Sequence, residues 1–156
     1  MINPSELVDN LVTLWRDIPE LVEEVDGSPD AIRAYHDQYP KQVSLDLAVL
    51  EMKAPSILVA WTGTTPGSFG GNDVWKHNLA AFVRARETAD GDPPPYYRIF
   101  RLMTKGVSAS IEQPMINAEV HPSCYPMEPP SIEREMPPEG LDYFRVNLSF
   151  TEIGDS

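Results

Sequence analysis

The stretch that decides the fold is LDYFRVNLSFTEI, residues 141–153 at the C-terminal end of the chain. Apolar side chains stand at every second position of this stretch: Phe144, Val146, Leu148 and Phe150. Successive side chains of a β-strand point to opposite faces, so the alternation predicts a strand with one buried face. The polar face carries no histidine, cysteine or carboxylate pair before Glu152, which favours a building block over an enzyme.

Length and charge limit the class of protein. The 156 residues form one domain of ordinary size, and a hydrophobic content of 42% excludes wholesale disorder. There are 12 basic and 24 acidic residues, so the formal net charge is −12. Phosphate binding requires clustered Lys and Arg, and we therefore expect a surface that repels nucleic acid.

Cysteine usage and hydropathy exclude further classes. Cys124 is the only cysteine, which excludes an intrachain disulfide and a cysteine metal cluster and indicates a small packing residue. No apolar run approaches the roughly 20 residues of a membrane-spanning helix. The N-terminus lacks the basic and apolar regions of a secretory signal. We expect a soluble protein, made in the cytoplasm, with no membrane partner.

Helices are predicted for the N-terminal segment, residues 3–52. Asn3 is a suitable N-cap, Pro4 suits the first helical position, and apolar residues follow at helical spacing. Pro19 lacks a backbone donor and is expected to restart the helix.

Two further short helices are expected before residue 52. One begins at residue 28 and carries Ile32 and Tyr35. Residues 44–52 alternate as a strand would, but they are rich in good helix formers, which favours a helix.

A strand, a loop and a second strand are predicted next. Residues 56–62 form a nearly continuous apolar run, typical of a strand buried on both faces. Residues 63–73, GTTPGSFGGND, contain four glycines and predict a long flexible loop with Phe69 near its tip. Residues 74–86 alternate as a strand, so the two strands are expected to form a hairpin.

The rest of the chain contains a helix and a proline-rich segment. A helix over residues 93–105 completes the central unit, residues 55–106. Prolines cannot donate ladder hydrogen bonds, so residues 107–140 are predicted to be extended, with short edge strands at 117–121 and 131–135.

These parts, ending in the strand over residues 141–153, predict a single domain spanning residues 1–156. Its class is α+β: a small, mostly antiparallel sheet with helices packed on one face, a long Gly-rich hairpin loop and a proline-rich extended excursion.

Residues with catalytic or metal-binding chemistry are few. His36, His77 and His121 do not have ligand spacing, and a zinc site needs at least three converging ligands. Cys124 and His121 would face opposite ways in an extended segment. The many carboxylates are interpreted as solvated charge. We therefore predict no catalytic residue, no cofactor and no metal.

The Gly-rich loop invites comparison with a phosphate-binding loop. It lacks the Gly-Lys-Ser/Thr ending and precedes a strand, so no helix N-terminus would face an anion. It is interpreted as a plain loop or as a partner-docking loop. Trp15 and Trp61 are expected in the core, and Trp75 at an interface, where aromatic residues concentrate. The predicted subunit contacts are Phe69, Trp75, Thr65, Ser68, Met127 and Ile132.

The order of elements resembles the tail terminator and neck (head–tail joining) proteins of long-tailed bacteriophages. The stretches that carry this resemblance are APSILVAW before the long loop, FVRA at residues 82–85, the helix that follows, and YFRVNLSFTE at residues 143–152. The proline-rich residues 114–138 depart from the family's pattern, which leaves the contacts with neighbouring subunits open.

The resemblance implies a structural protein of the virion. Such subunits form a ring, usually a hexamer, that caps the tail tube, ends its polymerisation and joins it to the head connector. The implied partners are further copies of the chain, the tail tube protein and head-connector proteins. DNA would pass through the lumen without specific binding, and the protein would be made in the host cytoplasm.

Two alternatives remain at this stage. One is a small ligand-binding or enzymatic domain with the loop at residues 63–73 as a lid, which needs convergent polar groups. The other is an adaptor or inhibitor that mimics nucleic acid, which predicts acids on one face, whereas the acids here are dispersed along the sequence.

Overall fold

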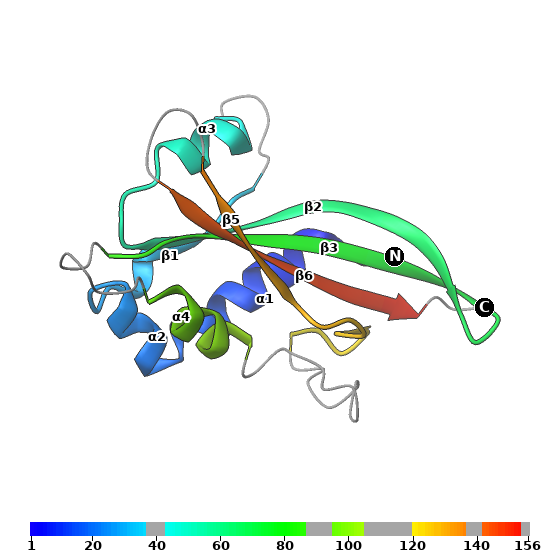
Figure 1. Cartoon of the computed structure of the whole chain (residues 1–156). Helices are drawn as coiled ribbons and strands as arrows, with labels where there is room; N and C mark the ends of the chain where they lie inside the picture. Colours follow the sequence, from blue (N-terminus) through cyan, green and yellow to red (C-terminus); the bar gives the residue numbers. More distant parts are fainter. Residues whose placement is uncertain (37–42, 87–94, 105–119, 137–141, 154–156) are drawn as a thin grey trace.

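A computed structural model describes residues 1–36, 43–86, 95–104, 120–136 and 142–153 (Figure 1). The helices are α1 (Pro4–Arg16), α2 (Pro19–Glu24), α3 (Leu45–Leu50) and α4 (Tyr96–Thr104), and a short 3-10 helix, η1 (Pro29–Ala31), follows α2. The strands are β1 (Ile32–Ala34), β2 (Ser56–Phe69), β3 (Asn72–Arg84), β4 (Cys124–Tyr125), β5 (Ser131–Glu135) and β6 (Tyr143–Ile153).

All these strands belong to one sheet with the order β1-β2-β3-β6-β4, and β5 also pairs with β6. Only the β1–β2 pairing is parallel. β5 and β4 pair with opposite ends of β6, on the side away from β3. The protein is therefore of the α+β class with a mostly antiparallel sheet, as the sequence predicts.

The C-terminal strand lies inside the sheet. β6 pairs with β3 along ten consecutive positions, from Val74↔Ile153 to Val83↔Phe144. The predicted alternation is confirmed, because Val146, Leu148 and Phe150 are buried in the main core.

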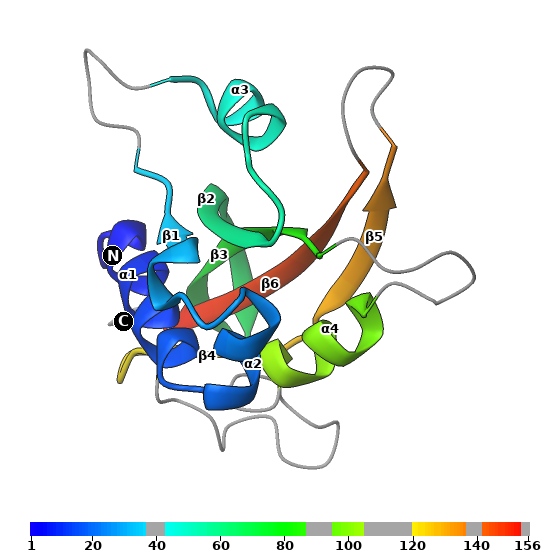
Figure 2. The ribbon, with the colours of Figure 1, turned by 90° about the vertical axis from the view of Figure 1, so that its left-hand side faces the viewer.

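α1, α2 and α4 cover one face of the sheet, and α3 lies on the other (Figure 2). α1, α2 and α4 contribute buried residues to the main core. Trp15 of α1 is fully buried, as predicted, and its indole N–H donates to the carbonyl oxygen of Met103 at the end of α4, at 2.8 Å. α3 departs from the predicted arrangement, because Val49 belongs to a second, smaller core with Leu58 and Phe82 on the opposite face.

The predicted long loop at residues 63–73 is wrong. β2 and β3 pair from Gly63↔Asn78 to Phe69↔Asn72, and only Gly70 and Gly71 lie between the two strands. Both glycines have positive φ, +60° and +82°, as a two-residue type I′ hairpin turn requires. The end of β2 that begins at Gly63 consists mainly of small residues whose side chains are mostly exposed. Its sequence therefore shows no alternation of apolar and polar residues that would predict a strand.

The other predicted elements have mixed outcomes. The helix expected from residue 28 forms only as the short 3-10 helix η1, and its extension to Ile32 and Tyr35 is wrong: Ile32 begins β1 and pairs in register with Ile57. This pairing is long-range, which local propensity cannot reveal. The helix favoured within residues 44–52 is confirmed as α3, and that over 93–105 is confirmed as the shorter α4.

In the proline-rich segment, the strand predicted at residues 131–135 is confirmed as β5. Residues 117–119 of the strand predicted at 117–121 lie outside the described residues. Of the two that are described, His121 forms an isolated bridge with Cys124. The two-residue strand β4 was not predicted.

The turn gives a testable prediction. Gly70→Val should speed amide hydrogen exchange near the tip of the hairpin roughly 5–30-fold, because a β-branched residue at positive φ costs about 1–2 kcal/mol. Gly70→Asn should leave exchange nearly unchanged, since Asn tolerates this conformation. Equal effects of the two substitutions would contradict the type I′ assignment, and amides of β6 near Leu148 serve as the internal reference.

Candidate functional site

The paired ends of β2 and β3 form an arm, defined here as residues 63–78. The arm begins at a β-bulge between Trp61 and Gly63, where the register of β2 against β3 shifts. Its tip lies at one end of the molecule, beyond the end of β6 (Figure 1). β1 pairs with β2 no further than Val59. Among the described strands, none pairs with the outer edge of β2 from Ala60 onward.

The arm differs in charge from the rest of the protein. It contains one acidic residue, Asp73, and one basic residue, Lys76, whereas the whole chain carries −12. Lys76 forms an ion pair with Glu128, in the connection between β4 and β5. The arm is therefore a nearly neutral, mostly exposed segment on a strongly acidic protein.

The predicted contact residues fall into two groups. Thr65, Ser68 and Trp75 are exposed on the arm, and Trp75 is 37% exposed. Phe69 lies at the end of β2, where its backbone pairs with Asn72; its side chain is outside what the structure describes.

The other two predicted contacts lie elsewhere. Met127 is half-buried in the connection between β4 and β5, next to the Glu128 that reaches Lys76. Ile132 lies on β5, where it packs partly buried against the main core, so its side chain contributes to the fold.

Trp61 is not in the core, and this prediction is wrong. Its side chain is 47% exposed, and its indole N–H donates to the hydroxyl oxygen of Thr64 at 3.0 Å. The bulge that follows Trp61 ends the regular part of β2.

A polar cluster lies at the base of the arm. The side chain of His77, on β3, is fully buried. Its Nδ1 lies 2.8 Å from the hydroxyl of Thr64 on β2, and its Nε2 lies 3.0 Å from Oε1 of Glu152 on β6. A neutral imidazole satisfies both neighbours when the hydroxyl donates to Nδ1 and Nε2–H donates to the carboxylate. The cluster thus links three strands through side chains.

Glu152 also fastens the N-terminal segment. The backbone N–H of Ile2 donates to both carboxylate oxygens, at 2.9 and 3.0 Å. Burial alone would raise the pKa of this carboxyl, but the hydrogen bonds from His77 and Ile2 and the nearby N-terminal ammonium hold the pKa below its usual value. The carboxylate is therefore ionised at neutral pH and accepts all these hydrogen bonds.

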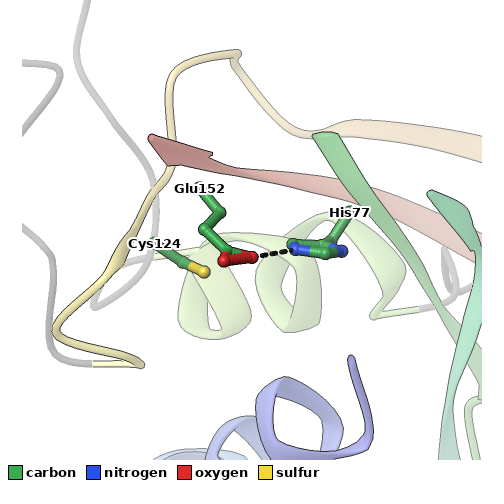
Figure 3. Close-up of side chains that lie close together, drawn as sticks. All are labelled: His77, Cys124 and Glu152. Carbon is green, nitrogen blue, oxygen red and sulfur yellow. Dashed lines mark hydrogen bonds and ion pairs between the residues drawn. The ribbon is translucent and has the colours of Figure 1, made fainter. Parts of the chain in front are cut away.

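Cys124 completes the cluster (Figure 3). Its side chain, on β4, is fully buried. Burial and the negative charges of Glu152 and Glu6 raise the pKa of the thiol to about 12. Its sulfur, a ring nitrogen of His77 and a carboxylate oxygen of Glu152 all lie within 4.8 Å of one another.

Sequence reasoning missed this cluster. It compared Cys124 with His121, but the His121 ring is hydrogen-bonded to Glu6 and to the backbone N–H of Ser123. The sequence does contain a signal for these residues. His77 and Glu152 stand at alternate positions of their strands whose other members are core residues. The period shows that such residues point inward; only the β3–β6 register shows that they meet.

The hydroxyl–imidazole–carboxylate chain resembles the relay that activates a nucleophile. A pocket of about 510 Å³ is lined by Trp61, Tyr35, His36 and the first turns of α1, but not by Thr64, His77 or Glu152. Residues 63–73 do not line it either, so a lid role for this segment has no support there.

No protein-family model matches the chain, and no curated protein matches its sequence. Within the described residues, none of the helices has the length and apolar character needed to cross a membrane.

The polar cluster predicts a specific stability effect. Thr64→Val should lower the free energy of unfolding by about 1–3 kcal/mol, because it keeps the shape but leaves a buried imidazole nitrogen unpaired. Thr65→Val, at the exposed neighbouring position, should change it by no more than about 0.5 kcal/mol. Urea denaturation followed by circular dichroism measures both, and similar losses for the two variants would contradict the role of the Thr64 hydroxyl.

Proposed function

We propose that this protein is a non-enzymatic structural subunit that assembles with copies of itself into a ring, of the kind formed by phage tail terminators. The observation that carries the proposal is the arm: a nearly neutral, exposed β-hairpin on a protein with a net charge of −12.

Charge argues for contacts through the arm. Copies of a protein with this net charge repel one another, and juxtaposed like charges disfavour an interface. The arm has one charge of each sign, and its basic residue is already paired with Glu128. A neighbouring copy can therefore approach the arm at lower electrostatic cost than it can approach the acidic body.

Side chains and backbone of the arm also support this proposal. Trp75 is a large aromatic residue exposed on the arm, and aromatic residues dominate the centres of protein interfaces. The outer edge of β2 offers backbone groups to an added strand. Pro66 removes one donor from this strand, which limits uncontrolled edge-to-edge association.

The tail terminator class is proposed from the order of elements. An N-terminal helix, a pair of long strands, a further helix and a C-terminal strand follow one another as in the resemblance drawn from the sequence. In this role the ring, a hexamer in most such proteins, caps the tail tube, ends its polymerisation and joins it to the head connector. The acidic surface suits a lumen through which DNA passes without being held.

The first experiment is the native mass of the purified protein at high concentration, alone and with candidate tail tube subunits, together with negative-stain images. Closed rings support the proposal. A strict monomer that ignores every tube subunit would overturn it.

A shortened arm tests the interface directly. This variant lacks Gly67 and Ser68 of β2 and their partners Val74 and Asp73 of β3. Each strand loses two residues, so the register and the turn are kept. We expect a folded protein, by circular dichroism, that no longer forms rings by native mass. Unchanged assembly would exclude the tip of the arm from the interface.

Point variants provide a matched pair. Trp75→Ser should weaken assembly at least about tenfold, since an aromatic hot spot of an interface contributes about 2 kcal/mol or more. Tyr97→Ser is the control, because this tyrosine is 71% exposed on α4, outside the arm. Equal effects on the assembly midpoint would contradict a special role for Trp75.

A further inference from the structure

We infer that His77, Cys124 and Glu152 form a binding site for a divalent transition-metal ion, with Zn²⁺ as the best match to the donor set. The three side chains come from three strands, β3, β4 and β6, and converge at the base of the arm (Figure 3). This inference is independent of ring assembly.

The geometry is close to what an ion requires. Zinc binds nitrogen, sulfur and oxygen ligands at about 2.0–2.3 Å in a tetrahedron, so pairs of ligand atoms lie roughly 3.3–3.8 Å apart. Here the three ligand atoms lie within 4.8 Å of one another, and the His77–Glu152 pair is at 3.0 Å. Movements of the ligand atoms by a fraction of an ångström to about one ångström, through side-chain rotation, therefore bring them to the distances that a bound ion requires.

The donor types select the class of ion. Ca²⁺ and Mg²⁺ prefer oxygen ligands, whereas an imidazole, a thiolate and a carboxylate together suit Zn²⁺ and related transition metals. A thiolate and a carboxylate balance the two positive charges of the ion. The ion thus removes the main cost of burying two negative side chains together.

Proton positions change in a defined way when the ion binds. Cys124 releases its thiol proton to solvent and binds as the thiolate. The proton of His77 moves from Nε2 to Nδ1, which frees Nε2 for the ion and lets Nδ1–H donate to the Thr64 hydroxyl oxygen. Thr64 then orients the imidazole, as residues behind metal-binding histidines commonly do. Within the described ranges, no further His, Cys, Asp or Glu joins the three ligands.

The test uses the full chain, stripped of metal with a chelator and titrated with Co²⁺. We expect a thiolate-to-cobalt charge-transfer band that saturates near one equivalent and disappears when Zn²⁺ is added. Uptake without this band would indicate exposed acids as the ligands and would overturn the inference. No uptake by the folded protein would also overturn it.

Two variants identify the ligand. Cys124→Ser should abolish the band, and persistence of the band would assign it to another group. His36→Gln is the matched control, because the ring of this histidine contacts Asp9 and is not one of the three ligands. It should bind Co²⁺ as the parent protein does, and loss of the band in this variant would contradict the assigned ligand set.

Thermal unfolding tests the same inference even if a variant is less stable, because each protein is compared with its own metal-free state. Zn²⁺ in a hundredfold excess over its dissociation constant should raise the melting temperature of the parent protein by roughly 5–10 °C. The same addition should leave Cys124→Ser unchanged relative to its own metal-free state. Equal shifts in both proteins would overturn the inference.

Discussion

The antiparallel pairing of β3 with β6 is the interaction on which the rest of the structure depends. It joins the hairpin to the C-terminal strand from Val74↔Ile153 to Val83↔Phe144. This register sets both cores, because one face of the pair supplies Leu79, Ala81 and Leu148 to the main core and the other supplies Ala80 and Phe82 to the smaller one. A shift of one residue would exchange the two faces and expose the main core, so the register is strongly specified.

The same pairing places a polar cluster inside the protein. His77 and Glu152 occupy inward positions next to apolar neighbours, and each is satisfied by hydrogen bonds. Buried polar groups contribute little net stability compared with well-packed apolar residues, but they strongly penalise arrangements in which they lose their partners. The cluster therefore disfavours alternative positions of β2 and the N-terminal segment, because Thr64 and Ile2 are among its partners.

The parts of the fold that follow from the sequence are those with a local period. β6 and α1 show clear strand and helix spacing, and both were predicted nearly to their ends. Residues 63–73 of the arm were predicted as a loop because exposed Thr, Gly and Ser residues give no alternation, and their pairing comes from the partner strand. β1 and the bulge after Trp61 also depend on long-range pairing. The inward direction of His77 was readable, but its contact with Glu152 spans 75 positions.

The anchoring of the arm bears on how it would bind a neighbour. A hairpin tip of small, exposed residues loses conformational entropy when it docks, and this loss opposes assembly. The cluster of Thr64, His77 and Glu152 fixes the base of the arm to the sheet before any partner arrives. Only the tip then remains to be ordered, so an anchored arm would bind more tightly than a free one with the same contacts. The buried polar groups thus connect the stability of the sheet with the assembly proposed for the protein.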